Sequence, residues 1–218
     1  HWNFIKQAED TFLREARRLR DDGGQGADAL QQLAAVSRAL SAITGAQHDR
    51  MWRDDGWRLL SAGRQIERLT YLSEALSRGF YTNAVHDAAG FGVVLDLFDS
   101  TISFHARYQR SRAIAALIEH VVLNFENPRS LGWVVQTLNG RLARLDEREP
   151  GPLGDLSQGL QPPGADGLIR RCQSDQIGDF VHLQALLQQF MKAGAQLSTD
   201  ISLRHFTHTG EVRRSTGV

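Results

Sequence analysis

The stretch that most constrains the fold runs from residue 54 to residue 76, where apolar residues recur at the spacing of one helix face. The stripe consists of Leu59, Ala62, Ile66, Leu69, Leu72 and Leu76. A strand would bring every second side chain to one face, so this period predicts a helix. We expect it to begin near Asp55, where an acidic residue favours a helix start, and to end near Gly79.

The opposite face of this helix combines charge with aromatic rings. It carries Trp57, Leu60, Arg64, Glu67 and Tyr71. Two large aromatic side chains indicate that the face is at least partly buried, and a buried charge has to be paired or hydrogen-bonded. We therefore expect Arg64, Glu67 and Arg68 to form a polar network walled by Trp57 and Tyr71.

Helical spacing of apolar residues continues along most of the chain. Further helices are expected over about residues 2–20, 28–44, 90–109, 111–126, 128–147 and 177–201. Asp28 and Ser111 are expected to cap two of them, and Gly45 to stop one. Residues 80–89 are irregular, with one short helical turn at most. The run Val93–Leu95 has no partner strand, so the predicted fold is an all-α bundle of about six to seven helices.

A proline- and glycine-rich stretch at 149–167 interrupts this pattern. Four of the five prolines lie there with five glycines. It is interpreted as a flexible crossover loop within one domain over residues 1–218, because the helical segment after it could not bury itself alone. The polar tail after residue 209 is expected to fray. Since residue 1 is His and not Met, we expect the chain to begin inside a longer protein.

Composition excludes several classes of function. The 25 basic and 25 acidic residues balance, which argues against a binder of nucleic acid or of anionic membranes. The single cysteine, Cys172, allows no internal disulfide and no zinc cluster built on thiolates. No apolar run reaches the roughly 18 residues of a membrane span. We expect a cytoplasmic protein.

The second informative stretch runs from Glu126 to Leu131. Asn127 is suited to cap a helix and Pro128 to its first position. Arg129 then falls in the first turn, where a cation opposes the helix dipole by roughly 0.3–1 kcal/mol. A carboxylate such as Glu126 or Glu67 has to offset it, or a bound carboxylate or phosphate. A structural ion pair and an anion-binding site both fit this pattern.

Motifs for metal or cofactor chemistry are missing. A di-iron bundle needs two Glu-x-x-His pairs, and the chain has none; Asp179 and His182 approximate one without a mate. There is no glycine-rich phosphate loop and no Gly-x-Ser-x-Gly elbow, and nothing ties a serine and a histidine into a triad. We therefore expect no cofactor and no metal.

Two stretches, residues 56–68 and 127–131, resemble the central helix and a later helix start of the bacterial alpha-E domain family. Residues 100–108 are similar to a third family segment: Arg107 and Tyr108 match, while Phe104 and His105 replace the expected tyrosine and arginine. Together with the patterns above, the resemblance gives one candidate ligand-binding set: Arg64, Glu67, Arg68, Arg107, Tyr108, Asn127, Arg129 and Ser130.

The resemblance also implies a setting. Alpha-E domains look like companions of circularly permuted ATP-grasp ligases, fused to them or encoded beside them, often with a transglutaminase-like protease. This implies a non-catalytic binding and scaffolding module in peptide or amide-bond formation, which recognises a carboxylate on a peptide or amino-acid substrate.

The alternative is an enzyme of peptide or amino-acid modification. Glu67 would then act as general acid or base, and Arg64, Arg68 and Arg129 would stabilise a developing anion. A carboxylate flanked by two arginines tends toward a lowered pKa, which makes it a poor base near neutral pH. That argument favours the binding module.

Overall fold

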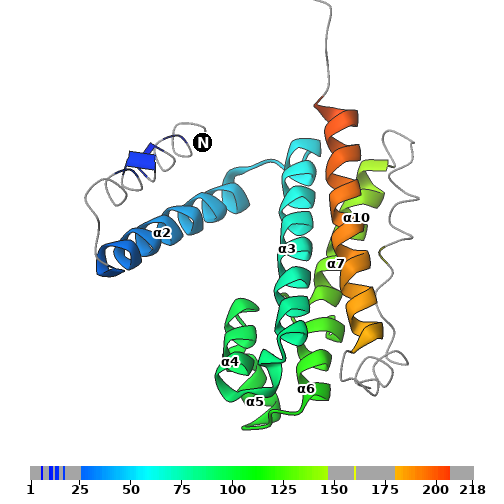
Figure 1. Cartoon of the computed structure of the whole chain (residues 1–218). Coiled ribbons are helices and arrows are strands. Elements are labelled where there is room, and N and C mark those ends of the chain that lie inside the picture. The colour runs from blue at the N-terminus through cyan, green and yellow to red at the C-terminus, as the bar shows by residue number, and fades with distance from the viewer. Residues whose placement is uncertain are drawn as a thin grey trace, which may run out of the picture. The chain divides into compact units, whose positions relative to one another are not determined.

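A computed structural model of the chain describes residues 26–146, 160 and 180–206, with residues 6, 10, 11, 13, 14 and 17 of the first segment. The fold is an all-α helical bundle, as expected, and the described residues contain no strand (Figure 1). The chain divides into two compact units, His1–Trp57 and Arg58–Val218.

The described part of the first unit is dominated by α2 (Gly26–Arg50). The expectation that this helix stops at Gly45 is wrong, because it continues for five further residues. A glycine inside a helix costs only about 1 kcal/mol relative to alanine, which its neighbours can offset. Asp28, the expected cap, lies inside the helix. Leu33 and Leu40, two apolar residues of this helix, are exposed.

The second unit is organised around α3 (Asp55–Tyr81), which closely matches the predicted helix. Its stripe is buried as expected from Ala62 to Leu76, with Leu59 partly buried. The last helix, α10 (Val181–His205), packs along α3. Gln184 Nε2 donates to Ser77 O at 3.0 Å. An added Cβ at Gly194 would lie 2.6 Å from Thr70 Oγ1, so glycine allows the two helices to approach closely.

The expected single helix over 90–109 is instead two helices, α4 (Ala88–Leu97) and α5 (Thr101–Tyr108). The turn between them has left-handed backbone at Asp99, with φ of 46°. Asp99 N donates to Asp96 O and Ser100 N to Leu95 O, each at 2.9 Å. These two hydrogen bonds form a Schellman motif, which ends α4 and redirects the chain.

The short turn expected within 80–89 is the 3-10 helix η1 (Ala84–His86). After it, Asp87 accepts hydrogen bonds from Ala89 N and Gly90 N at 3.0 and 3.2 Å and caps α4. These backbone hydrogen bonds are the main cause of the lowered pKa of Asp87.

The next predicted helix, over 111–126, is also shorter than expected. It begins as α6 (Ile114–Ile118) and continues as a π-helical segment, η2 (Glu119–Leu123). Ala113, not Ser111, occupies the cap position, although Ser111 Oγ accepts from Ala113 N at 3.2 Å. Phe125, within the predicted range, lies beyond the helical segment and is exposed.

The helix α7 (Leu131–Asp146) follows, within the predicted range 128–147, and buries an apolar stripe from Leu131 to Leu145. Leu160 is the one described residue of the stretch at 149–167; it is buried, and its carbonyl accepts from Asn139 Nδ2 at 3.4 Å. The rest of the predicted loop and the tail after residue 209 lie outside the described residues.

Candidate functional site

The turn before α7 sets the position of Arg129. Asn127 Oδ1 accepts from Arg129 N, and Asn127 O accepts from Ser130 N, each at 3.0 Å. Ser130 Oγ accepts from Trp133 N at 3.1 Å and donates to Asn124 O, so Ser130 is the cap. The expectation that Asn127 caps the helix is therefore wrong, and Arg129 precedes the helix because the asparagine side chain closes the turn.

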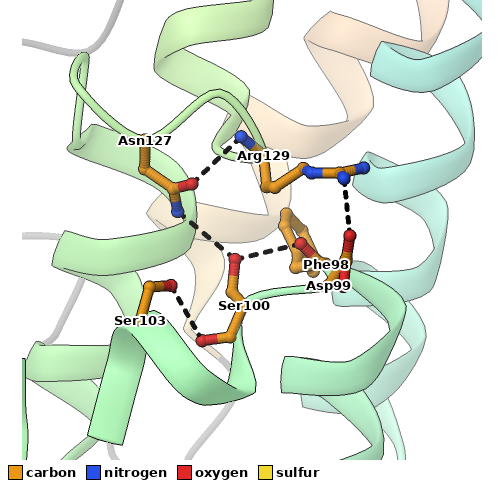
Figure 2. Close-up of polar contacts among 6 residues, drawn as sticks. All are labelled: Phe98, Asp99, Ser100, Ser103, Asn127 and Arg129. Atoms are coloured by element: carbon orange, nitrogen blue, oxygen red, sulfur yellow. Dashed lines mark hydrogen bonds and ion pairs between the residues drawn. The ribbon is translucent and has the colours of Figure 1, made fainter. Parts of the chain in front are cut away.

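Arg129 makes an ion pair with a carboxylate that the sequence analysis did not name. Its Nη2 lies 2.6 Å from Asp99 Oδ2 (Figure 2). The expected partners, Glu126 and Glu67, are both exposed, and the Schellman turn brings Asp99 to Arg129 instead. The two side chains are 45% and 71% exposed, so the pair is solvated and contributes about 0–1 kcal/mol to stability.

Arg68 lies beside this pair. Its pKa is lowered by burial first, and then by the guanidinium groups of Arg129 and Arg64, while Asp99 raises it. Arg64 of α3 and Arg129, two residues of the expected ligand-binding set, thus lie within electrostatic reach of Arg68, a third. Within the described part of the chain, no hydrogen bond or ion pair reaches the half-buried Arg68 guanidinium. We call Arg64, Arg68, Arg129 and Asp99 the arginine cluster.

The side chains expected to surround this network, Trp57 and Tyr71, are not both buried. Glu67 is exposed on α3, and Tyr71, one turn further on, is 56% exposed. The ring of Trp57 contacts the Arg53 guanidinium, whose Cζ lies 4.3 Å from the ring centroid. The face is therefore partly buried, as expected: Trp57 is only 9% exposed, but position on the face did not predict the exposure of Glu67 and Tyr71.

Arg107 and Tyr108 belong to a second group of side chains around His120. Arg107 Nη2 lies 3.2 Å from Glu119 Oε1. The Tyr108 ring is 5.8 Å from the His120 ring, and burial, followed by Glu119, raises the pKa of Tyr108. Ser103 Oγ lies 2.9 Å from His120 Nε2.

A buried serine and Asn127 connect the two groups. Asn127 Nδ2 donates to Ser100 Oγ at 3.3 Å and to His120 O at 3.1 Å. Ser100 is fully buried and donates to Phe98 O at 2.9 Å, and its own carbonyl accepts from Ser103 Oγ at 3.0 Å (Figure 2). Asn127 thereby holds the turn of Asp99, the turn of Arg129 and the π-helical segment in one network.

This geometry can bind an anion at the arginine cluster.

Among the described residues, no three histidine, cysteine, aspartate or glutamate side chains converge as metal ligands would. None of the helices in the described segments combines the length and the apolar character needed to cross a bilayer.

Comparison with known proteins gives one family and a few curated relatives. The family model described as "Alpha-E: a predicted alpha-helical domain with a conserved ER motif" matches residues 1–206. Uncharacterized proteins of Mycobacterium bovis and Mycobacterium tuberculosis are each 28% identical over 115 residues, which is 51% of this chain. That stretch spans only 13% of the length of each relative. No solved structure matches the chain.

Proposed function

The chain belongs to the Alpha-E family, and from this premise we propose that it is a helical binding module whose arginine cluster recognises a carboxylate on a peptide or amino-acid substrate. In this proposal the module partners a circularly permuted ATP-grasp amidoligase, which carries out peptide or amide-bond formation, and works beside a transglutaminase-like protease. The long mycobacterial relatives, of which the matched stretch is 13%, are compatible with a domain that works within larger proteins.

The observation that carries the proposal is the environment of Arg68. Its half-buried guanidinium lies within electrostatic reach of two further guanidinium groups and of the Asp99 carboxylate, and has no hydrogen bond or ion pair among the described residues. A charge taken partly out of water is costly unless it is paired. A bound anion would supply the missing partner.

A carboxylate fits this site better than a point-like anion. Guanidinium groups present planar pairs of donors that match the two oxygens of a carboxylate. Asp99 already occupies one arginine with its own carboxylate at 2.6 Å. A substrate carboxylate could therefore bind Arg68 directly and compete with Asp99 for Arg129.

The alternative of an enzyme based on Glu67 has no comparable support. Glu67 is exposed on α3, while the carboxylate beside Arg129 belongs to Asp99. A general base that works with Arg64, Arg68 and Arg129 would have to lie beside their guanidinium groups, where Asp99 lies and Glu67 does not.

Binding to short peptides tests the recognition step. We expect calorimetry to detect peptides with a free C-terminal carboxylate, and the same peptides with an amidated C-terminus to bind at least tenfold more weakly. Arg68→Met should abolish binding. Arg78→Met is the control, because Arg78 is also on α3 but pairs with Glu74 at 2.7 Å. Equal binding of the free and amidated peptides would refute carboxylate recognition.

The partnership needs its own experiment. The chain and an ATP-grasp ligase encoded in the same genome should co-elute in size-exclusion chromatography and show faster ligation together than the ligase alone. If neither co-elution nor acceleration occurs, the partnership is wrong even where peptide binding holds.

A further inference from the structure

We propose that Ser103 and His120 form a nucleophile–base pair that accepts an acyl group from an activated carboxylic ester, an activity beyond the binding of a substrate carboxylate. Ser103 lies on α5 and is exposed, whereas His120 lies on the π-helical segment η2 and is only 3% exposed. Ser103 Oγ is 2.9 Å from His120 Nε2, within the reach that a nucleophile and its base require.

The depth of the two residues suits this chemistry. The serine hydroxyl can meet a substrate from solvent, and the histidine stands behind it, shielded by Phe104 and Tyr108, whose rings lie 5.5 and 5.8 Å away. The surrounding π-helical segment is itself notable, because such segments occur frequently at functional sites.

The charge state of His120 also suits a base. Burial lowers the pKa of His120, the nearby Arg107 guanidinium lowers it further, and Glu119 raises it. The imidazole is therefore neutral near pH 7. The base role requires the tautomer with hydrogen on Nδ1, an atom with no hydrogen-bond partner among the described residues; Nε2 then accepts the hydroxyl hydrogen of Ser103, which otherwise goes to Ser100 O at 3.0 Å.

Donors for a developing oxyanion lie at the start of α5. Ser103 is the third residue of this helix, and the backbone N–H groups of Thr101, Ile102 and Ser103 have no acceptor within the helix. The side chain of the cap residue Ser100 accepts no hydrogen bond from these N–H groups. Its hydroxyl donates to Phe98 O and accepts from Asn127 Nδ2 instead. These N–H groups have no acceptor among the described residues, and such groups beside a nucleophile can stabilise a tetrahedral oxyanion.

Acyl transfer from the ester to Ser103, and its later hydrolysis, need no further reactant except water. Ser103 Oγ attacks the ester carbonyl carbon while its proton passes to His120 Nε2. The tetrahedral adduct then expels the alcohol portion, which takes the proton from Nε2, and the acyl group remains on Ser103. Water then attacks the acyl carbonyl carbon while its proton passes to His120 Nε2. The second adduct expels Ser103 Oγ, which takes the proton from Nε2, and the carboxylic acid is released.

Covalent labelling tests this proposal directly. A fluorophosphonate probe forms a P–O bond to Ser103 and releases fluoride. Intact-mass analysis should show one added probe, and peptide mapping should place it on Ser103. A wild-type chain with no label at Ser103 above that at Ser202 would overturn the proposal. Ser202 is a suitable reference because it is an exposed helical serine whose hydroxyl also donates to a main-chain carbonyl, at 2.8 Å.

Variants separate a reactive pair from a structural one. Ser103→Ala should remove the label, and Ser202→Ala should leave it unchanged. His120→Gln keeps a neutral hydrogen-bonding side chain but no base, so its labelling rate should fall about 100-fold or more. Unchanged labelling of a folded His120→Gln chain would refute the role of His120. For the wild type, the labelling rate at Ser103 should decline as pH falls and His120 is protonated. Arg107, Glu119 and Tyr108 are the titratable groups that surround His120.

Discussion

Arg129 Nη2 lies 2.6 Å from Asp99 Oδ2, and the backbone of Asp99 is left-handed, with φ of 46°. The pair joins the turn between α4 and α5 to the start of α7. Asp99 occupies the position of the Schellman motif where glycine is the usual residue, because a side chain in this conformation costs about 1–2 kcal/mol. A solvated ion pair does not offset that cost, which points to a role for the carboxylate at the arginine cluster.

The first prediction concerns Asp99→Gly. Glycine removes the backbone strain but loses the ion pair and raises the entropy of the unfolded chain, so the free energy of unfolding should change by less than about 1 kcal/mol. Affinity for a carboxylate peptide should rise, since Arg129 is released. Urea unfolding and calorimetry measure the two effects. Asp99→Asn, which removes only the charge, should raise affinity similarly; a loss of affinity in both variants would show that Asp99 helps to hold the ligand.

The second prediction concerns Arg68→Met. Because Arg68 is half-buried among like charges, replacing it with an apolar side chain should leave the free energy of unfolding unchanged or raise it, by up to about 1 kcal/mol. Glu67→Ala, at an exposed position next to it, should change stability by less than about 0.5 kcal/mol. A loss of several kcal/mol in either variant would reveal a structural partner, and denaturant titration decides.

The sequence predicted those elements whose burial follows a regular period. The stripes of α3 and α7 are buried on one side only, so their spacing is visible without the structure. The break at Asp99 was missed because Leu95, Phe98 and Ile102 keep helical spacing across it, although Ile102 is 88% exposed. The dipeptide Asp99-Ser100 was the available signal, since both residues favour turns.

The candidate site was predictable only in part. The charged and aromatic face of α3, the arginine at a helix start and the resemblance to the family together grouped Arg64 and Arg68 with Arg129. No local pattern could assign Ser103 to His120, because the two are 17 residues apart and meet through a π-helical register that apolar spacing does not encode. Glu67 was placed in the network because it shares a helix face with Arg64, but Glu67 is exposed whereas Arg64 is partly buried.

The third prediction concerns Asn127→Ala. Asn127 donates to Ser100 Oγ and His120 O and accepts from Arg129 N, so its loss should lower the free energy of unfolding by about 1–3 kcal/mol. Asn124→Ala is the matched control: the Asn124 side chain accepts one hydrogen bond, from Glu126 N at 2.9 Å, and should cost about 1 kcal/mol or less. Equal costs in urea unfolding would mean that Asn127 does not organise the network.

The fourth prediction uses two glycines of α4. A Cβ at Gly90 would lie 2.3 Å from Ala84 O, so Gly90→Ala should displace η1 and lower the free energy of unfolding by about 1–3 kcal/mol. Gly92→Ala meets nothing within 4 Å and should raise stability by up to about 1 kcal/mol through helix propensity. Thermal melts of the two variants should therefore shift in opposite directions; a shared direction would contradict the close approach of η1 to α4.

The last prediction is the pH dependence that His120 imposes. Its pKa in the folded chain is lowered by burial and by Arg107, while in the unfolded chain it is about 6.5. As pH falls below about 6.5, the unfolded chain binds a proton that the folded chain does not, so stability declines and levels off below the folded pKa. Melting temperatures from pH 7.5 to 5 should fall more steeply for the wild type than for His120→Gln, with the difference between the two isolating His120 from the other titrating groups. Parallel curves would show that the imidazole takes up its proton without opening the fold, and His120 could not then be a buried neutral base for Ser103.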